Sequence, residues 1–121
     1  MFRILVIDDE PKWIEFTTHK LSRTFEMDVA RDVDTALDKL NNNTYDLLIA
    51  SARYHDCLKR LHKEHSETRL VVVTGQPTTQ EAIEMYRLGA FDYFAKDFRR
   101  KVVSEKIQEA LAKPVLAVSP L

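Results

Sequence analysis

Three apolar runs of the chain are followed by polar side chains that could form one charged pocket. Asp8 and Asp9 follow the first run, Thr74 ends another, and Lys96 follows the last. Carboxylates, a hydroxyl and an ammonium group together can hold a charged ligand. Ligand sites of parallel sheets lie at the carboxyl ends of the strands, so these groups should meet if the runs are parallel strands.

Five strand-length apolar runs alternate with stretches of helical spacing. The runs are rich in Val, Ile, Leu and aromatic residues, and several are continuously apolar, which is typical of parallel strands covered on both faces. We expect strands at residues 3–7, 26–30, 46–50, 70–74 and 91–95. Strict alternation of strand and helix predicts an α/β fold with a parallel sheet and helices on both faces.

Each of these runs is followed by an apolar stripe that predicts a helix. The stripes comprise Ile14, Thr17, Leu21 and Phe25; Val33, Ala36, Leu37 and Leu40; Leu58, Leu61 and His65; Ala82, Ile83 and Tyr86; and Val103, Ile107, Ala110 and Leu111. Asp9 is a capping residue ahead of Pro11, Thr78 or Thr79 caps the fourth helix, and Gly89 fits a left-handed end cap.

The composition is that of one ordinary domain. Its 121 residues are 45% hydrophobic and 31% charged, and 18 Lys and Arg against 19 Asp and Glu give a net charge of -1. This balance offers no general attraction to nucleic acid or to an anionic membrane. Two glycines are too few for a Walker loop or a dinucleotide-binding turn, and one cysteine excludes an internal disulfide.

The apolar runs are too short to span a bilayer, and the first residues are not those of a signal peptide. We therefore expect a cytoplasmic domain over residues 1–112. Lys113 and Pro114 end the last stripe, so residues 113–121 read as a tail or a truncated linker.

Four segments resemble the receiver domain of two-component response regulators. They are FRILVIDDEP at residues 2–11, YDLLI at 45–49, VVVTG at 71–75 and LGAFDYFAK at 88–96. They come in the family's order and span roughly residues 2 to 112. The resemblance implies a (βα)5, flavodoxin-like or CheY-like fold with a doubly wound sheet in the order 2-1-3-4-5.

The resemblance also implies residue roles. In the family, an acidic pair on the first strand and an aspartate ending the third bind Mg²⁺, and that aspartate accepts a phosphoryl group. Asp8 and Asp9 match the acidic pair, and Lys96 matches the lysine that neutralises the phosphoryl oxygens. Thr74 and Tyr93 match the hydroxyl and the aromatic that rearrange to report phosphorylation.

The phosphoacceptor position departs from the family pattern, because it holds Ser51. The loop at residues 51–56 lacks the usual proline and glycine and looks several residues short, and Asp97 stands where a proline usually follows the lysine. A serine hydroxyl needs a base to attack, whereas a carboxylate does not. We therefore expect no phosphorylation at Ser51.

The serine at this position should also weaken the binding of a metal cofactor. Serine removes one of about three carboxylate charges, each worth roughly 4 kcal/mol at ~4 Å before solvation offsets it. We expect no cofactor, or Mg²⁺ held weakly by Asp8 and Asp9. A hypothesis from charge types alone places the Arg53 guanidinium among these carboxylates in place of a metal, with Lys96 as the preferred partner.

Structural interpretations stand beside the functional ones. Asp8 and Asp9 can serve as a helix cap, and Ser51 as a small strand-end residue. Thr74 and Tyr93 can be ordinary strand-end residues, an interpretation that ranks first without a phosphoryl group. Three further residues are assigned to packing: Cys57, and His62 and His65, which alone make no zinc site. Trp13, near the start of the first helix, is expected to border the pocket.

The leading functional hypothesis is a non-enzymatic receiver-like module that acts through protein contacts. In the family, the fourth helix, fifth strand and fifth helix form a face that meets a partner protein or a second copy. The residues expected on that face are Tyr86, Tyr93, Arg99, Arg100 and Lys101. An output domain beyond residue 121 is a further expected partner.

Two other functions stay open at this point. The chain could accept a phosphoryl group, with Mg²⁺, on Asp8, Asp9 or Asp56. Nucleic-acid binding through the basic cluster at residues 99–101 has weak support, because one short cluster in a neutral domain is a poor electrostatic footprint.

Overall fold

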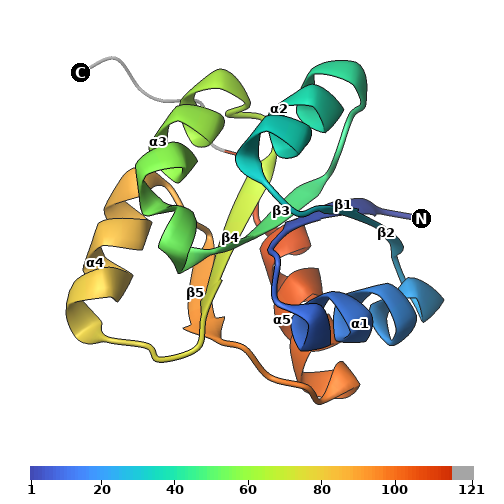
Figure 1. The fold of residues 1–121 in the computed structure, drawn as a ribbon. Helices are drawn as coiled ribbons and strands as arrows, with labels where there is room; N and C mark the ends of the chain where they lie inside the picture. Colours follow the sequence, from blue (N-terminus) through green and yellow to red (C-terminus); the bar gives the residue numbers. More distant parts are fainter. Residues whose placement is uncertain (116–121) are drawn as a thin grey trace.

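The computed structural model describes residues 1–115 and has one sheet of five parallel strands (Figure 1). The strands lie in the order β2-β1-β3-β4-β5, which confirms the predicted fold class. Their bounds are Arg3–Ile7 for β1, Glu26–Ala30 for β2, Leu47–Ser51 for β3, Arg69–Thr74 for β4 and Asp92–Ala95 for β5. The order reverses between β1 and β3, so the carboxyl ends of these two strands border a ligand-binding crevice.

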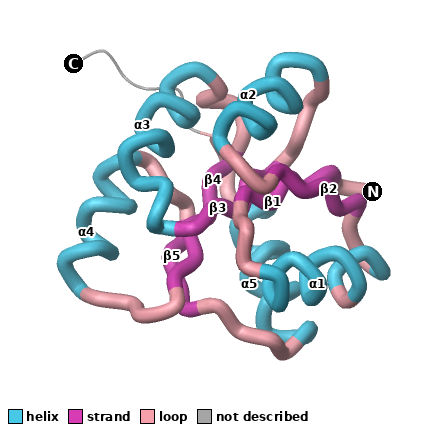
Figure 2. Tube along the Cα trace, in the orientation of Figure 1, coloured by secondary structure: helices cyan, strands magenta, loops and turns pink. Residues whose placement is uncertain are grey.

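Helices cover both faces of the sheet. They are α1 (Pro11–His19), α2 (Val33–Asn42), α3 (His55–Glu64), α4 (Thr79–Leu88) and α5 (Arg100–Ala112), with short 3₁₀ turns η1 (Leu21–Arg23) and η2 (Ala52–Tyr54). Figure 2 shows α1 and α5 on one face and α2, α3 and α4 on the other. Within the described residues, no helix is long and apolar enough to cross a membrane.

The two faces have separate apolar cores, and β1 contributes to both. Ile4 and Val6 pack with Trp13, Phe16 and residues of α5, whereas Leu5 and Ile7 pack with residues of α2, α3 and α4. Each fully buried aliphatic side chain of this kind contributes about 1.5–3 kcal/mol. Burial on both faces explains why the central strands read as continuous apolar runs.

A polar cluster fastens the edge strand β2. The Tyr45 hydroxyl donates to Asp28 Oδ2 at 2.5 Å, and Lys39 Nζ lies 3.1 and 3.2 Å from the two carboxylate oxygens. Partial burial raises the pKa of Asp28, but these hydrogen bonds outweigh it, so the pKa lies below its ordinary value. The cluster links β2, α2 and the segment before β3.

Most predicted helix ends are correct, but the first cap is wrong. Pro11 begins α1, Thr78 caps α4 by accepting from the Glu81 N–H at 3.1 Å, and Gly89 adopts φ 119 after α4. Asp9 does not cap α1, whose N-cap residue is Glu10 with no side-chain bond. The carboxylate of the preceding aspartate makes the turn instead, as described below.

Two predicted apolar stripes are only partly right. Leu21 and Phe25 are buried, but α1 ends at His19 and the chain continues through η1. On α4, Met85 is the buried residue, while Ile83 and Tyr86 are exposed by 46% and 49%. Because Ile83 lies two positions from Met85, it falls on the opposite side of the helix. The fourth helix therefore presents apolar groups to solvent.

Strand and tail bounds differ slightly from the expected ones. Ser51 pairs with Val73 and extends β3, whereas Asp46 precedes it and accepts the Arg3 N–H through its carboxylate at 2.8 Å. The fifth helix ends at Ala112 as expected, and residues 116–121 of the expected tail lie outside the described residues.

Candidate functional site

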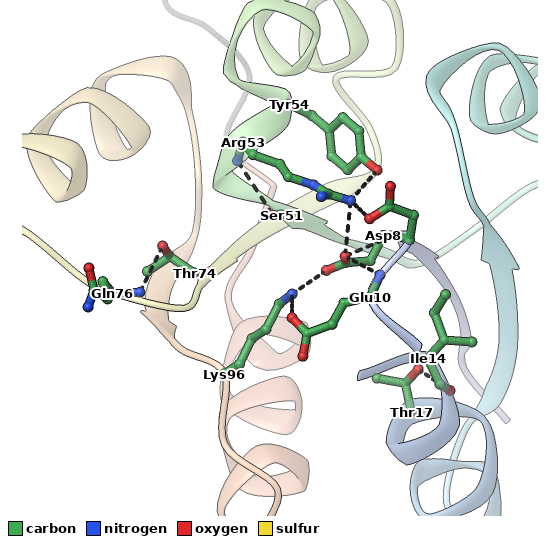
Figure 3. Close-up of polar contacts among 11 residues, drawn as sticks. Asp8, Glu10, Ile14, Thr17, Ser51, Arg53, Tyr54, Thr74, Gln76 and Lys96 are labelled. Atoms are coloured by element: carbon green, nitrogen blue, oxygen red, sulfur yellow. Dashed lines mark hydrogen bonds and ion pairs between the residues drawn. The ribbon is translucent and has the colours of Figure 1, made fainter. Parts of the chain in front are cut away.

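Asp8 is a buried carboxylate at the carboxyl end of β1, with a side chain only 1% exposed. Its Oδ1 accepts the backbone N–H groups of Asp9 at 2.9 Å and Glu10 at 3.1 Å, which turns the chain into α1 (Figure 3). A buried carboxylate is stable only when charge and hydrogen bonds compensate it. Asp8 therefore requires a cation close by.

Lys96 is that cation, and it follows β5 as expected. Its Nζ lies 2.8 Å from Asp8 Oδ2 and 2.8 Å from Glu10 Oε2, and its side chain is 9% exposed. Within residues 1–115, Asp8 Oδ2 accepts no hydrogen bond of good geometry, so Lys96 balances it chiefly by charge. The Lys96 backbone N–H donates to the Thr74 carbonyl at 2.8 Å. This hydrogen bond fixes the backbone position from which the Lys96 side chain extends.

Trp13 and Glu10 complete the surroundings of this lysine. Lys96 Nζ lies 5.9 Å from the Trp13 ring centroid, and the ring is fully buried, which agrees with its expected place beside the pocket. The role of Glu10 as a second carboxylate partner was not predicted. Its only signal in the sequence is its place directly after the acidic pair.

A second cation, Arg53, reaches from η2 to Asp8, which it shares with Lys96, and to Asp9. Its Nη2 contacts Asp9 Oδ1 and lies 3.6 Å from Asp8 Oδ1. The same atom lies 3.0 Å from the Tyr54 hydroxyl, and the guanidinium carbon lies 5.0 Å from the Tyr54 ring centroid. The charge types predicted this placement, and Figure 3 shows Arg53 and Lys96 on either side of Asp8.

Ser51 is buried at the end of β3 and has a structural contact. Its Oγ accepts the Arg53 N–H at 3.4 Å, so it caps the 3₁₀ turn that carries Arg53. The chain passes from β3 through η2 into α3 without further residues between them, which agrees with the short loop expected from sequence.

Thr74 and Tyr93 are both held by local hydrogen bonds. Thr74 Oγ1 accepts the Gln76 N–H at 3.4 Å. The Tyr93 hydroxyl donates to Glu81 Oε1 at 2.5 Å and accepts the Thr78 N–H at 3.2 Å. Burial and the Glu81 carboxylate raise the pKa of Tyr93. Tyr93 is thus tied to the start of α4 through Glu81, a partner that sequence reasoning missed.

The face formed by α4, β5 and α5 carries the other expected residues. Tyr86 donates to Asp92 Oδ1 at 3.1 Å, while Arg100 and Lys101 are exposed and have no ion pair within the described part of the chain. Arg99 differs from expectation, because α5 begins at Arg100 and Arg99 is its N-cap residue.

Arg99 is also engaged by a neighbouring acid. Its Nη2 lies 2.7 Å from Asp97 Oδ2, and its Nε donates to Asp97 Oδ1 at 3.1 Å. These hydrogen bonds lower the pKa of Asp97 to about 2. The basic cluster therefore offers two uncommitted cations rather than three.

Several other candidate residues lie outside the pocket. Asp56 is fully exposed on α3, where its carboxylate lies 3.4 Å from His55 Nδ1. His62, His65 and Cys57 are partly buried, which is the packing role expected for them. The His62 ring lies against Gly89, and burial lowers its pKa.

A cavity of about 470 Å³ lies near the start of β5, at the opposite end of the strand from Lys96. His62, Gly89 and Phe91 are among its lining residues, and it contains none of the pocket carboxylates. The charged pocket, not this cavity, holds the chemistry that the sequence predicts.

The pocket does not fit a divalent cation. One oxygen of Asp8 is used by two N–H groups and the other faces Lys96, while Asp9 is paired with Arg53. A neutral hydroxyl, Ser51, ends the third strand. In residues 1–115, no group of three or more His, Cys, Asp or Glu side chains is arranged to hold a metal.

Comparisons with known proteins agree with the fold. The family described as response regulator receiver domain matches residues 4–108. "Response regulator ArlR" of Staphylococcus haemolyticus is 25% identical over 119 residues, which are 93% of this chain and 54% of that protein. "Transcriptional regulatory protein DltR" of Streptococcus agalactiae is 27% identical over 112 residues, 88% of this chain and 50% of that protein. The chain thus spans about half the length of these curated relatives.

Solved structures share the fold closely. A response regulator from Thermotoga maritima superimposes with a TM-score of 0.87 at 19% identity and covers 93% of this chain and 99% of that one. The orphan response regulator HP1043 of H. pylori gives 0.79 at 25% identity, covering 91% and 96%. A structure described as an atypical orphan response regulator with a phosphorylation-independent mechanism gives 0.77 at 25% identity, covering 90% and 94%.

The pocket geometry makes the chain sensitive to the loss of one partner of the buried Asp8–Lys96 ion pair. Lys96→Met keeps an unbranched side chain of similar volume but leaves Asp8 without its opposing charge. We expect the free energy of unfolding, measured by urea denaturation, to fall by about 3 kcal/mol. Lys101→Met, an exposed control, should change it by no more than about 0.5 kcal/mol.

A double variant distinguishes the lost charge pair from lost packing. Adding Asp8→Asn to Lys96→Met removes the uncompensated carboxylate and should recover much of the loss. A Lys96→Met variant as stable as the wild-type chain would contradict the interpretation of Lys96 as the necessary counter-ion.

Proposed function

The chain belongs to the response regulator receiver family of two-component signalling, and on this premise we propose that it signals without phosphorylation at Ser51. The observation that carries the proposal is the charge state of the pocket. Lys96 and Arg53 already neutralise the carboxylates that the resemblance assigns to metal binding. The domain then acts as a protein-interaction module without catalytic activity.

The environment of Ser51 supports this proposal. The side chain is buried, and its oxygen accepts the Arg53 N–H. Within the described residues, no carboxylate or imidazole is hydrogen-bonded to this hydroxyl, so it lacks the base that nucleophilic attack requires. The fold likeness to a regulator described as phosphorylation-independent, at 25% identity, is consistent with the same mode of action.

The proposed contact surface is the face formed by α4, β5 and α5. Ile83 and Tyr86 expose apolar groups on α4, and Arg100 and Lys101 expose positive charge at the start of α5. Glu81, which accepts the Tyr93 hydroxyl, adds a partly exposed carboxylate on the side of α4 that faces β5. Acid on one helix and base on the other make this face complementary to a second copy related by a two-fold axis.

Other partners follow from the length of the relatives. The curated relatives are about twice as long as this chain, so a further domain of the full protein is a second partner to consider. Direct nucleic-acid binding is not proposed, because Arg100 and Lys101 are the only uncommitted cations of the basic cluster and the net charge is -1.

Intact mass after incubation with Mg²⁺ and acetyl phosphate tests the absence of phosphorylation. The wild-type chain should gain no phosphoryl group, because Ser51 lacks a base and Asp8 and Asp9 are paired. Ser51→Asp/Arg53→Ala, which supplies a carboxylate and removes the guanidinium, serves as the positive control.

One result would overturn the proposal. A hydroxylamine-labile phosphoryl group on the wild-type chain would identify an acyl phosphate on Asp8, Asp9 or Asp56. Its position, mapped by peptide sequencing, would then establish the chain as a phosphoryl acceptor of an unusual kind.

Sedimentation velocity over a wide range of concentration tests self-association. We expect the wild-type chain to dimerise at high concentration, and Arg100→Glu/Lys101→Glu to remain monomeric because the charge complementarity is reversed. Lys12→Glu/Lys20→Glu makes the same charge change on α1 and at its C-cap, and should leave the dimer intact. A wild-type chain that stays monomeric throughout would contradict the second copy as partner.

A further inference from the structure

We infer that the Arg53 guanidinium is the resident cation of the acidic pocket and excludes a divalent metal ion from it. The inference rests on the proposed function and deepens it, by naming the group that keeps the pocket in one charge state. Arg53 lies between the two carboxylates that the family resemblance assigns to the metal, in contact with Asp9 and 3.6 Å from Asp8.

The charges of the pocket are nearly balanced only when Arg53 is counted. Three carboxylates, those of Asp8, Asp9 and Glu10, face two cations, Arg53 and Lys96. Without Arg53 the lysine alone would oppose them, and the excess negative charge would favour a metal ion. A metal entering the present pocket would meet two fixed positive charges within a few ångströms.

Three contacts hold Arg53 in place. Ser51 Oγ accepts its backbone N–H at 3.4 Å, and the Tyr54 hydroxyl and ring lie against its guanidinium. An ion pair as exposed as Arg53–Asp9, with side chains 49% and 55% exposed, is weak when its partners are free to move. Because η2 and Tyr54 orient the guanidinium beforehand, little conformational freedom is lost on pairing.

The same turn connects the pocket to α4. Arg53, Tyr54 and His55 are consecutive, and His55 Nε2 lies 3.4 Å from Glu84 Oε2 on α4. A guanidinium seated on Asp9 therefore fixes the start of α3 and, through it, a contact with α4. A built-in cation thus connects the acidic pocket to the packing of α3 against α4 without metal.

Mn²⁺ binding, measured from the electron paramagnetic resonance of the free ion, tests this inference. The comparison uses Ser51→Asp, which places a carboxylate at the end of β3, with and without Arg53→Gln. Ser51→Asp/Arg53→Gln should bind Mn²⁺ about tenfold or more tightly than Ser51→Asp, because the competing charge is gone. Ser51→Asp/Arg60→Gln removes a charge from the exposed face of α3 and should match Ser51→Asp.

Two outcomes would overturn the inference. One is Mn²⁺ affinity in Ser51→Asp/Arg53→Gln within roughly twofold of Ser51→Asp. The other is an equal gain from Arg53→Gln and Arg60→Gln, which would indicate a general effect of net charge. If Ser51→Asp does not fold by circular dichroism, Arg53→Gln and Arg60→Gln in the wild-type background give the same comparison.

The result is separable from a failure of the proposed function. That function fails if the wild-type chain is phosphorylated or if its interaction face binds nothing, and neither outcome measures Mn²⁺ affinity. A wild-type chain that is unphosphorylated and yet binds Mn²⁺ as tightly as Arg53→Gln would refute the role of Arg53 alone.

Discussion

The buried carboxylate of Asp8 is the constraint on which the rest of the pocket depends. Its position after a strand covered on both faces removes it from water, so protein groups have to compensate its charge. Two backbone N–H groups, Lys96 and the nearby Arg53 do so. The direction of the β1–α1 turn and the position of the chain after β5 both follow from satisfying this one group.

The residues around the pocket that depart from the family pattern fit together in one arrangement. A hydroxyl at the end of β3 caps a tight turn, the turn places Arg53 over the acidic pair, and no longer loop intervenes before α3. Asp97 engages Arg99 beside the lysine. The features at β3 and η2 favour a pocket whose carboxylates are largely neutralised by the chain's own cations, which is the physical basis of the proposed phosphorylation-independent function.

The sequence predicts the fold well because the spacing of apolar residues along the chain largely determines the strands and helices. Continuous apolar strands, the cap at Thr78 and the glycine at position 89 are local signals, and the structure confirms them. The pairings Lys96–Glu10 and Tyr93–Glu81 were missed, because several rotamers of long side chains suit the same spacing. On α4, Ile83 was assigned to the buried side since its apolar character does not reveal which way the helix is turned.

Amide chemical shifts of the isotope-labelled wild-type chain test most directly whether the pocket is already complete. The spectra would be recorded before and after adding Mg²⁺ and beryllofluoride, an analogue of a phosphoryl group. The charge balance predicts that the amides of β5 and α4, including those of Tyr93 and Glu81, keep their positions. Saturable shifts running from Asp8 through Tyr93 to α4 would show that the pocket still takes up a metal and an anion, and would contradict the central claim.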